Sequence, residues 1–241
     1  MRICSVETRE FDADILALMG RRLKRCGDVD VEVEGGRAHA RAELDSEGFP
    51  VWCAAVEELL LYDLMHFELA RMVEAMPIPL NDKREILSES VREVRKSGSK
   101  GIVTLIMEHY ASADKLNLEG FMRFRMRDVV ASWELTVMRA AEEQLIKNEY
   151  LELMSVLNAF VRLQPAKVRE ISVVLNPDGS CTVTDDSSAR IDCDNCAGDS
   201  VISMLVSLAP ERVTVYDLSF GKCSLLSEVL TRVFEGRIKF F

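Results

Sequence analysis

The sequence predicts an α+β fold: an N-terminal strand–helix–hairpin, a helical middle region and a mixed, partly parallel C-terminal sheet. Three observations predict it. A Gly35-Gly36 pair separates two runs of alternating apolar and polar residues. Residues 118–163 contain a single glycine and no proline, as expected of long helices. After Pro165, short β-branched runs alternate with helical patterns, which predicts strands joined by right-handed crossover helices.

The N-terminal part predicts a strand at 2–6, a helix from 11 to 26 and then a hairpin. The Gly35-Gly36 pair tolerates positive φ at both central positions, which suits a two-residue turn. Counting outward from this turn sets acid opposite base on the outer face: Glu34 with Arg37, Glu32 with His39 and Asp30 with Arg41. The other strand face carries small alanines, which let a helix lie close: Ala38, Ala40 and Ala42.

These patterns divide the chain into three regions. Residues 1–48 form a small α/β segment, which either stands alone or completes the C-terminal sheet. Residues 49–164 form the helical region, with one helix from about Pro50 to Met76. Residues 165–241 form the C-terminal α/β region, with strands predicted at 170–175, 180–184, 212–217 and 237–241.

Composition narrows the classes of function. The chain has 241 residues, a net charge of −10 and 48% hydrophobic residues, as expected of a folded protein with a sizeable core. The acidic balance argues against a nucleic-acid partner, because such affinity comes mainly from Lys and Arg. The N-terminus has no signal-peptide pattern, and no apolar run approaches the ~20 residues of a membrane span. We therefore expect a cytoplasmic protein with reduced cysteines and no membrane span.

The segment 117–128 is the most informative part of the sequence. Asn117 suits a helix N-cap, and Glu119 in the first turn favours the helix dipole. Gly120 costs stability inside a helix, so we expect another backbone to pass close to it. At 100° per residue, one continuous helix places Arg125 inside an apolar arc and two further arginines beyond its edge. The arc consists of Leu118, Phe121, Met122, Val129, Val130 and Trp133.

Three interpretations of this segment follow. The favoured one is a structural Arg125, paired with an acidic side chain between helices, since an unpaired buried charge is very costly. The second is an anion- or partner-binding groove. A third use, stacking on single-stranded nucleic acid, is opposed by the net charge. The candidate binding residues are Asn117, Glu119, Gly120, Phe121, Arg123, Phe124, Arg125 and Arg127.

The same segment carries a family resemblance. Its sequence, Asn-Leu-Glu-Gly-Phe-Met-Arg-Phe-Arg-Met-Arg-Asp, resembles the signature of the YtxC-like family, which is associated with sporulation. The resemblance implies a bacterial cytoplasmic protein linked to endospore formation. It assigns no reaction, no cofactor and no catalytic residue.

Two other clusters are candidate chemical sites. Cys193 and Cys196 have the spacing of a metal or redox pair, but a structural zinc needs four ligands, and Cys181 and Cys223 would have to complete the set. A single Cys-x-x-Cys motif without further ligands usually consists of two reduced thiols. Asp63 and His66 fall near the apolar face of one helix, where a satisfied core pair is favoured over general-base chemistry.

The sequence therefore favours a non-catalytic interaction or regulatory protein over an enzyme, with no cofactor and no catalytic residue predicted. The alternatives are a metal- or thiol-dependent activity in the Cys193/Cys196 loop, and nucleic-acid binding by the helix that carries Arg123, Arg125 and Arg127. The sequence leaves the partner and the oligomeric state open.

Overall fold

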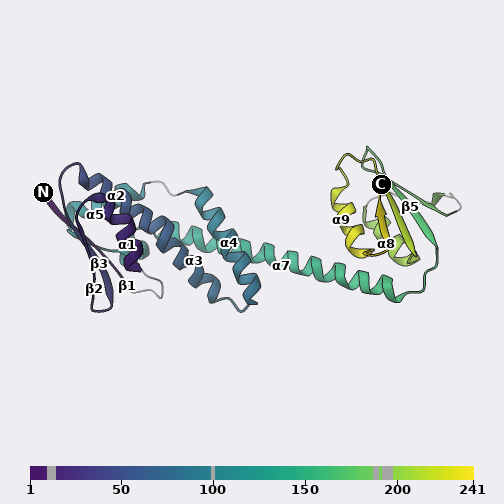
Figure 1. Ribbon diagram of the computed structural model, residues 1–241, viewed down its shortest axis with the longest axis horizontal. Helices are drawn as coiled ribbons and strands as arrows, with labels where there is room; N and C mark the ends of the chain where they lie inside the picture. Colours follow the sequence, from purple (N-terminus) through teal and green to yellow (C-terminus); the bar gives the residue numbers. More distant parts are fainter. Residues whose placement is uncertain (10–14, 99–100, 187–189, 192–197) are drawn as a thin grey trace. The chain divides into compact units, whose positions relative to one another are not determined.

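The computed structural model describes residues 1–9, 15–98, 101–186, 190–191 and 198–241 (Figure 1). The chain forms two compact units, Met1–Gln144 and Leu145–Phe241. Its elements confirm the predicted α+β class with a helical middle region. Long helix α7 (Arg127–Leu163) contributes residues to both units.

The first unit begins with a sheet whose strand order is β2-β3-β1-β4. Besides α7, its elements are β1 (Arg2–Arg9), α1 (Ile15–Leu23), η1 (Lys24–Cys26), β2 (Val29–Glu34), β3 (Arg37–Leu44), α2 (Gly48–Glu58), η2 (Leu59–Leu64), α3 (Met65–Glu74), α4 (Leu80–Ser97), α5 (Ile102–Ser112), β4 (Lys115–Asn117) and α6 (Leu118–Phe124). The first three strands are thus extended by β4, which pairs parallel with β1.

The hairpin register confirms the prediction: Glu34 pairs with Arg37, Glu32 with His39 and Asp30 with Arg41. Both turn glycines have positive φ, 58° at Gly35 and 74° at Gly36, as a turn of this kind requires. Ala38, Ala40 and Ala42 are buried, and α1 packs against this hairpin. Small side chains in the strand therefore allow the close approach of a helix, as expected.

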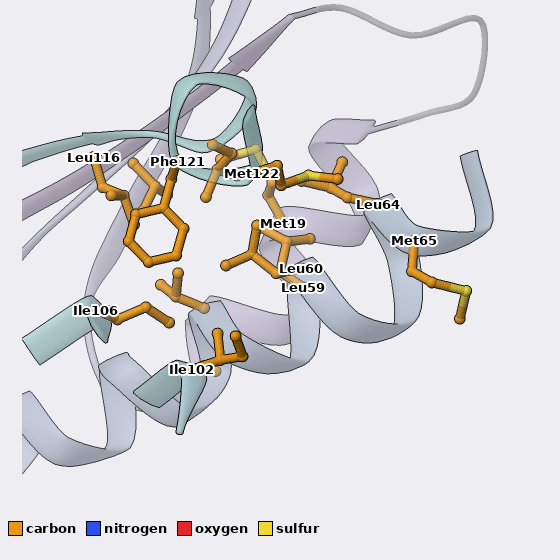
Figure 2. Close-up of a cluster of buried hydrophobic side chains, with 14 of the residues drawn as sticks. Met19, Leu59, Leu60, Leu64, Met65, Ile102, Ile106, Leu116, Phe121 and Met122 are labelled. Atoms are coloured by element: carbon orange, nitrogen blue, oxygen red, sulfur yellow. The ribbon is translucent and has the colours of Figure 1, made fainter. Parts of the chain in front are cut away.

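The core of the first unit lies among the helices and the inner face of the sheet. Helices α2 and α3 are joined through η2, a π-helical stretch, so the predicted single helix is continuous but wider in the middle. Leu59 and Leu60, at the start of this stretch, are both fully buried. In Figure 2, Phe121 and Met122 of α6 reach into this core, near Ile106 and Leu60.

The second unit has the strand order β7-β6-β5-β8-β9. Its elements are β5 (Glu170–Leu175), β6 (Cys181–Asp185), β7 (Arg190–Ile191), α8 (Gly198–Leu208), β8 (Arg212–Asp217), α9 (Ser224–Val233) and β9 (Ile238–Phe240). Strands β5, β8 and β9 are parallel neighbours, which confirms the partly parallel sheet.

One crossover runs through α8 to β8, and the next runs from β8 through α9 to β9. Both step in the same direction along this sheet. Right-handed connections therefore place α8 and α9 on the same face (Figure 1). Contact between the two helices agrees with this: a Cβ on Gly198 of α8 would lie 3.5 Å from Leu226 of α9. The end of α7 also belongs to this unit, where the Asn158 side chain donates a hydrogen bond of 2.9 Å to the Val233 carbonyl.

Candidate interaction site on helices α6 and α7

Asn117 fixes the start of α6 with both ends of its amide. It ends strand β4, where it lies beside Glu7 in the parallel register with β1. Its Oδ1 accepts a hydrogen bond of 2.7 Å from the Gly120 backbone N–H, which confirms the predicted N-cap. Its Nδ2 donates a hydrogen bond of 2.8 Å to Glu7 Oε1. The helix is thereby capped and attached to the sheet by one side chain.

Glu119 makes a second attachment to β1. Its Oε1 accepts hydrogen bonds from the Thr8 hydroxyl, at 2.7 Å, and from the Arg9 backbone N–H. Thr8 is fully buried, so this bond satisfies a hydroxyl that water cannot reach. Glu119 Oε2 is also buried and has no hydrogen-bond partner among the described residues. The sequence pattern assigned Glu119 to the helix dipole and to the candidate binding residues, and gave no sign of this contact with β1.

Gly120 is needed for a different reason from the one predicted. A Cβ at this position would meet Asn117 Oδ1 at 3.0 Å, and the nearest atoms all belong to Asn117. Among the described residues, no backbone atom of another segment lies closer than 3.8 Å to that Cβ position. Glycine therefore makes room for the helix's own cap, and the expected close crossing of another backbone is wrong.

The helix is interrupted at Arg125, which resets its phase. The backbone N–H groups of Arg125 and Met126 both donate to the Phe121 carbonyl, at 2.8 and 3.1 Å, and α7 then begins at Arg127. Phe121 and Met122 are buried before the break, and Met126 is buried after it. The continuous helical wheel across 118–133 therefore placed the wrong residue in the core.

Arg125 is exposed, so the predicted buried arginine is wrong. Arg123, Arg125 and Arg127 are all exposed, and within the described part of the chain none of their guanidinium groups is in an ion pair. Between them, Phe124 is 76% exposed. The Arg123 guanidinium carbon lies 5.7 Å from the Phe124 ring centroid, within cation–π distance. We call Arg123, Phe124, Arg125 and Arg127 the arginine–phenylalanine surface.

The carboxylate of Glu7 is the centre of a polar cluster beside the start of α6. Besides the Asn117 amide, it is approached by Lys115 Nζ at 2.6 Å, Arg37 at 3.4 Å and His39 at 3.7 Å. Burial alone would raise the pKa of Glu7. The hydrogen bonds from Asn117 and Lys115, with the positive charges of Lys115 and Arg37, outweigh burial and lower that pKa below its ordinary value. Glu7 is therefore held as a carboxylate.

Comparison with protein families identifies the chain. The model of the YtxC-like family matches residues 66–239, which is most of the sequence. The chain belongs to the YtxC-like family. The match includes the whole arginine–phenylalanine surface and the strands β5, β6, β8 and nearly all of β9. Family membership suggests a sporulation-related protein. Comparisons with curated proteins and with solved structures gave no match.

The other predicted pair in this YtxC-like protein does not form. Asp63 accepts hydrogen bonds from Arg22, at 2.8 and 3.2 Å, and not from His66. His66 is exposed, and its ring lies against Phe67 with centroids 6.2 Å apart. The helical wheel placed both residues near one face, but the wider π-helical stretch ends just before His66. The expected core pair of carboxylate and imidazole is therefore wrong.

The cysteine cluster of this YtxC-like protein is described only in part. Cys193 and Cys196 lie outside the described residues. Cys181 and Cys223 are buried in the core of the second unit, and Cys223 Sγ lies 3.7 Å from the Gly179 carbonyl oxygen. Within the described residues, no group of three or more His, Cys, Asp or Glu side chains is arranged to hold a metal ion. In the same residues, no helix is long and apolar enough to cross a bilayer.

Proposed function

We propose that this protein is a non-catalytic interaction protein of endospore formation, and that the arginine–phenylalanine surface binds an acidic segment of a partner protein. One observation carries the proposal. Three arginines within five residues are exposed around an exposed Phe124 and lack an ion pair among the described residues. The residues just before them, by contrast, are occupied in attaching α6 to β1.

Charge supports an acidic partner. The chain has 40 acidic and 30 basic residues, so acceptors for arginine are in excess. Several other arginines of the first unit take them: Arg22 and Arg25 pair with Glu58, and Arg37 with Glu7. Guanidinium groups left without carboxylates are suited to bidentate pairing with carboxylates of another molecule. Phe124 adds an apolar anchor of the kind that contributes strongly at interfaces.

Nucleic acid is the competing partner, because arginine and aromatic side chains also bind single strands. The excess of ten negative charges opposes it by repelling phosphates at longer range. A protein segment with carboxylates and apolar side chains matches both features of the surface, whereas a phosphate backbone matches only the arginines.

Fluorescence anisotropy with two labelled probes tests the proposal. The first is a peptide of alternating Glu and Phe, and the second is oligo(dT) of equal charge. We expect the peptide to bind more tightly, and Arg123→Gln with Arg125→Gln to weaken that binding by about tenfold or more, since each charged hydrogen bond contributes about 1.5–3 kcal/mol. Phe124→Ala should weaken it as well.

The matched control removes two arginines elsewhere on the same unit. Arg84 and Arg139 are exposed and have no ion pair among the described residues, so Arg84→Gln with Arg139→Gln makes the same change in net charge. This control should leave peptide binding nearly unchanged. Equal weakening by both pairs of substitutions would show a general charge effect and reject the surface. Tighter binding of oligo(dT) than of the peptide would reject the acidic protein partner.

The link to endospore formation needs a test in cells. In a spore-forming host that carries this gene, the Arg123→Gln, Arg125→Gln variant should lower the number of heat-resistant spores as deletion of the gene does. The Arg84→Gln, Arg139→Gln control should not. Normal spore numbers after deletion would reject the role in sporulation and leave the binding measurement standing.

A further inference from the structure

The second unit contains an apolar helix face that its own core does not use. Six large apolar side chains on the last part of α7 are between 51% and 86% exposed. They are Leu145, Ile146, Leu153, Val156, Phe160 and Leu163. At 100° per residue all six fall within an arc of about 100°, so they form one continuous stripe. We call this stripe the outer α7 face.

The outer α7 face is distinct from the face that holds the unit together. Met154 and Val161 are buried in the core of the second unit, with Tyr150 and Leu157 packed against it. These four residues occupy the neighbouring arc of the helix. The helix is therefore apolar on two adjacent faces, while the fold of this unit explains only one of them.

We propose that the outer α7 face pairs, antiparallel, with the same face of a second copy of this chain. The residues along this arc have the same spacing when they are counted from either end of the segment 146–163. Read forward from Ile146, steps of three and four residues lead along the same arc to Glu149, which is charged, and to Leu153. Read backward from Leu163, the stripe continues at 160 and 156, in the same steps. A two-fold axis can therefore set Ile146 opposite Leu163, residue 149 opposite Phe160, and Leu153 opposite Val156 of the second copy.

Charge selects the antiparallel arrangement. Between Ile146 and Leu163, Glu149 is the one acidic residue that lies in the middle of the arc. A parallel pair of helices would place the two Glu149 side chains against each other, which is unfavourable. The antiparallel pair separates them, and places each beside a Phe160 ring, along which the methylene groups can lie while the carboxylate reaches water.

The size of the surface fits a dimer. A large apolar side chain carries roughly 100 Å² of surface, so six that are more than half exposed leave on the order of 300–400 Å² on each copy. Patches of this size on a monomer commonly mark interaction sites. Two copies, with the polar side chains of Asn148 and Glu152 at the rim, approach the ~1,000 Å² in total that a specific interface needs.

Sedimentation equilibrium of the full chain tests the proposal first. We expect a mass that rises with concentration towards twice the 27.2 kDa of one chain. Leu153→Glu should raise the dimer dissociation constant by about tenfold or more, because it places a carboxylate in the centre of the interface on both copies. Leu135→Glu is the matched control, since Leu135 is 65% exposed on the same side of the helix but lies about three turns before Ile146, beyond the segment that pairs; it should change the dissociation constant little.

Oxidative cross-linking tests the orientation and does not depend on a destabilising variant. A mixture of Ile146→Cys and Leu163→Cys chains should form the mixed disulfide faster than either chain forms a disulfide with itself. The unsubstituted protein measures the cross-linking that its native cysteines give. Faster self-linking of each variant would overturn the antiparallel arrangement. A monomer at all concentrations, or a dimer that Leu153→Glu and Leu135→Glu affect equally, would overturn the proposal.

Discussion

Asn117 Nδ2 donates a hydrogen bond of 2.8 Å to Glu7 Oε1, across 110 residues of sequence. The other end of the same amide caps α6. The side chain therefore holds the helix start and the sheet in one fixed relation, and the arginine–phenylalanine surface begins less than two turns further along. Rigid presentation of that surface lowers the entropy lost when a partner binds.

Asn117→Ala should lower the free energy of unfolding by about 2–3 kcal/mol, because it removes a helix cap and a hydrogen bond to a charged group. Asn117→Asp separates the two contributions. It keeps the cap acceptor but sets a carboxylate against Glu7, so it should destabilise at neutral pH and less at acid pH. Urea unfolding followed by tryptophan fluorescence measures this, since Trp52 and Trp133 are both buried in the first unit. Equal stability of Asn117→Asp and the natural protein at neutral pH would contradict the contact.

Glu7 should make stability depend on acid pH. Its pKa in the folded chain is lowered below the ordinary value of 4.5. The carboxylate therefore contributes stability above that ordinary value, and this contribution is lost as pH falls through the folded pKa. Glu7→Gln removes the effect. The difference in unfolding free energy between the natural protein and Glu7→Gln should be largest near neutral pH and shrink at acid pH. A difference that stays constant over this range would show that Glu7 keeps an unperturbed pKa.

Local signals in the sequence predicted the parts of the fold that local geometry determines. Gly35-Gly36 fixed a two-residue turn, and the hairpin register followed from it by counting. Asn117 followed by Glu119 and an apolar pattern predicted a helix start, and the cap is present. In both cases, the contacts that matter lie within a few residues of each other along the chain.

Contacts between distant segments were not predictable in this way. Thr8 and Glu119 are 111 residues apart, and no pattern near either one indicates the other. The helix break at Arg125 has no glycine or proline of the kind that usually marks a break. The helical wheel therefore treated residues before and after Arg125 as one continuous helix. Residues 145–163 are apolar on two adjacent faces, so periodicity alone could not tell which of them faces the core.

Gly20 and Gly120 should respond differently to the same substitution. Gly20 lies within α1, and a Cβ there would meet only the end of the Lys24 side chain, at 3.9 Å. Gly20→Ala should therefore stabilise by about 0.5–1 kcal/mol, the usual gain of alanine over glycine in a helix. Gly120→Ala adds a methyl group against Asn117 Oδ1, so the displaced cap should cancel or exceed that gain. Urea unfolding compares them, and an equal gain at both positions would show that the cap tolerates the methyl group.

Arg125→Ala and Met126→Ala should separate binding from folding at adjacent positions. Arg125 is exposed and has no ion pair among the described residues, so its loss should change the free energy of unfolding by no more than about 0.5 kcal/mol. Met126 is 1% exposed, and its truncation should cost about 2–4 kcal/mol through a core cavity. Only Arg125→Ala should weaken binding of the Glu–Phe peptide in a chain of normal stability. A loss of more than about 1 kcal/mol for Arg125→Ala would mean that the guanidinium supports the fold, and would remove it from the binding surface.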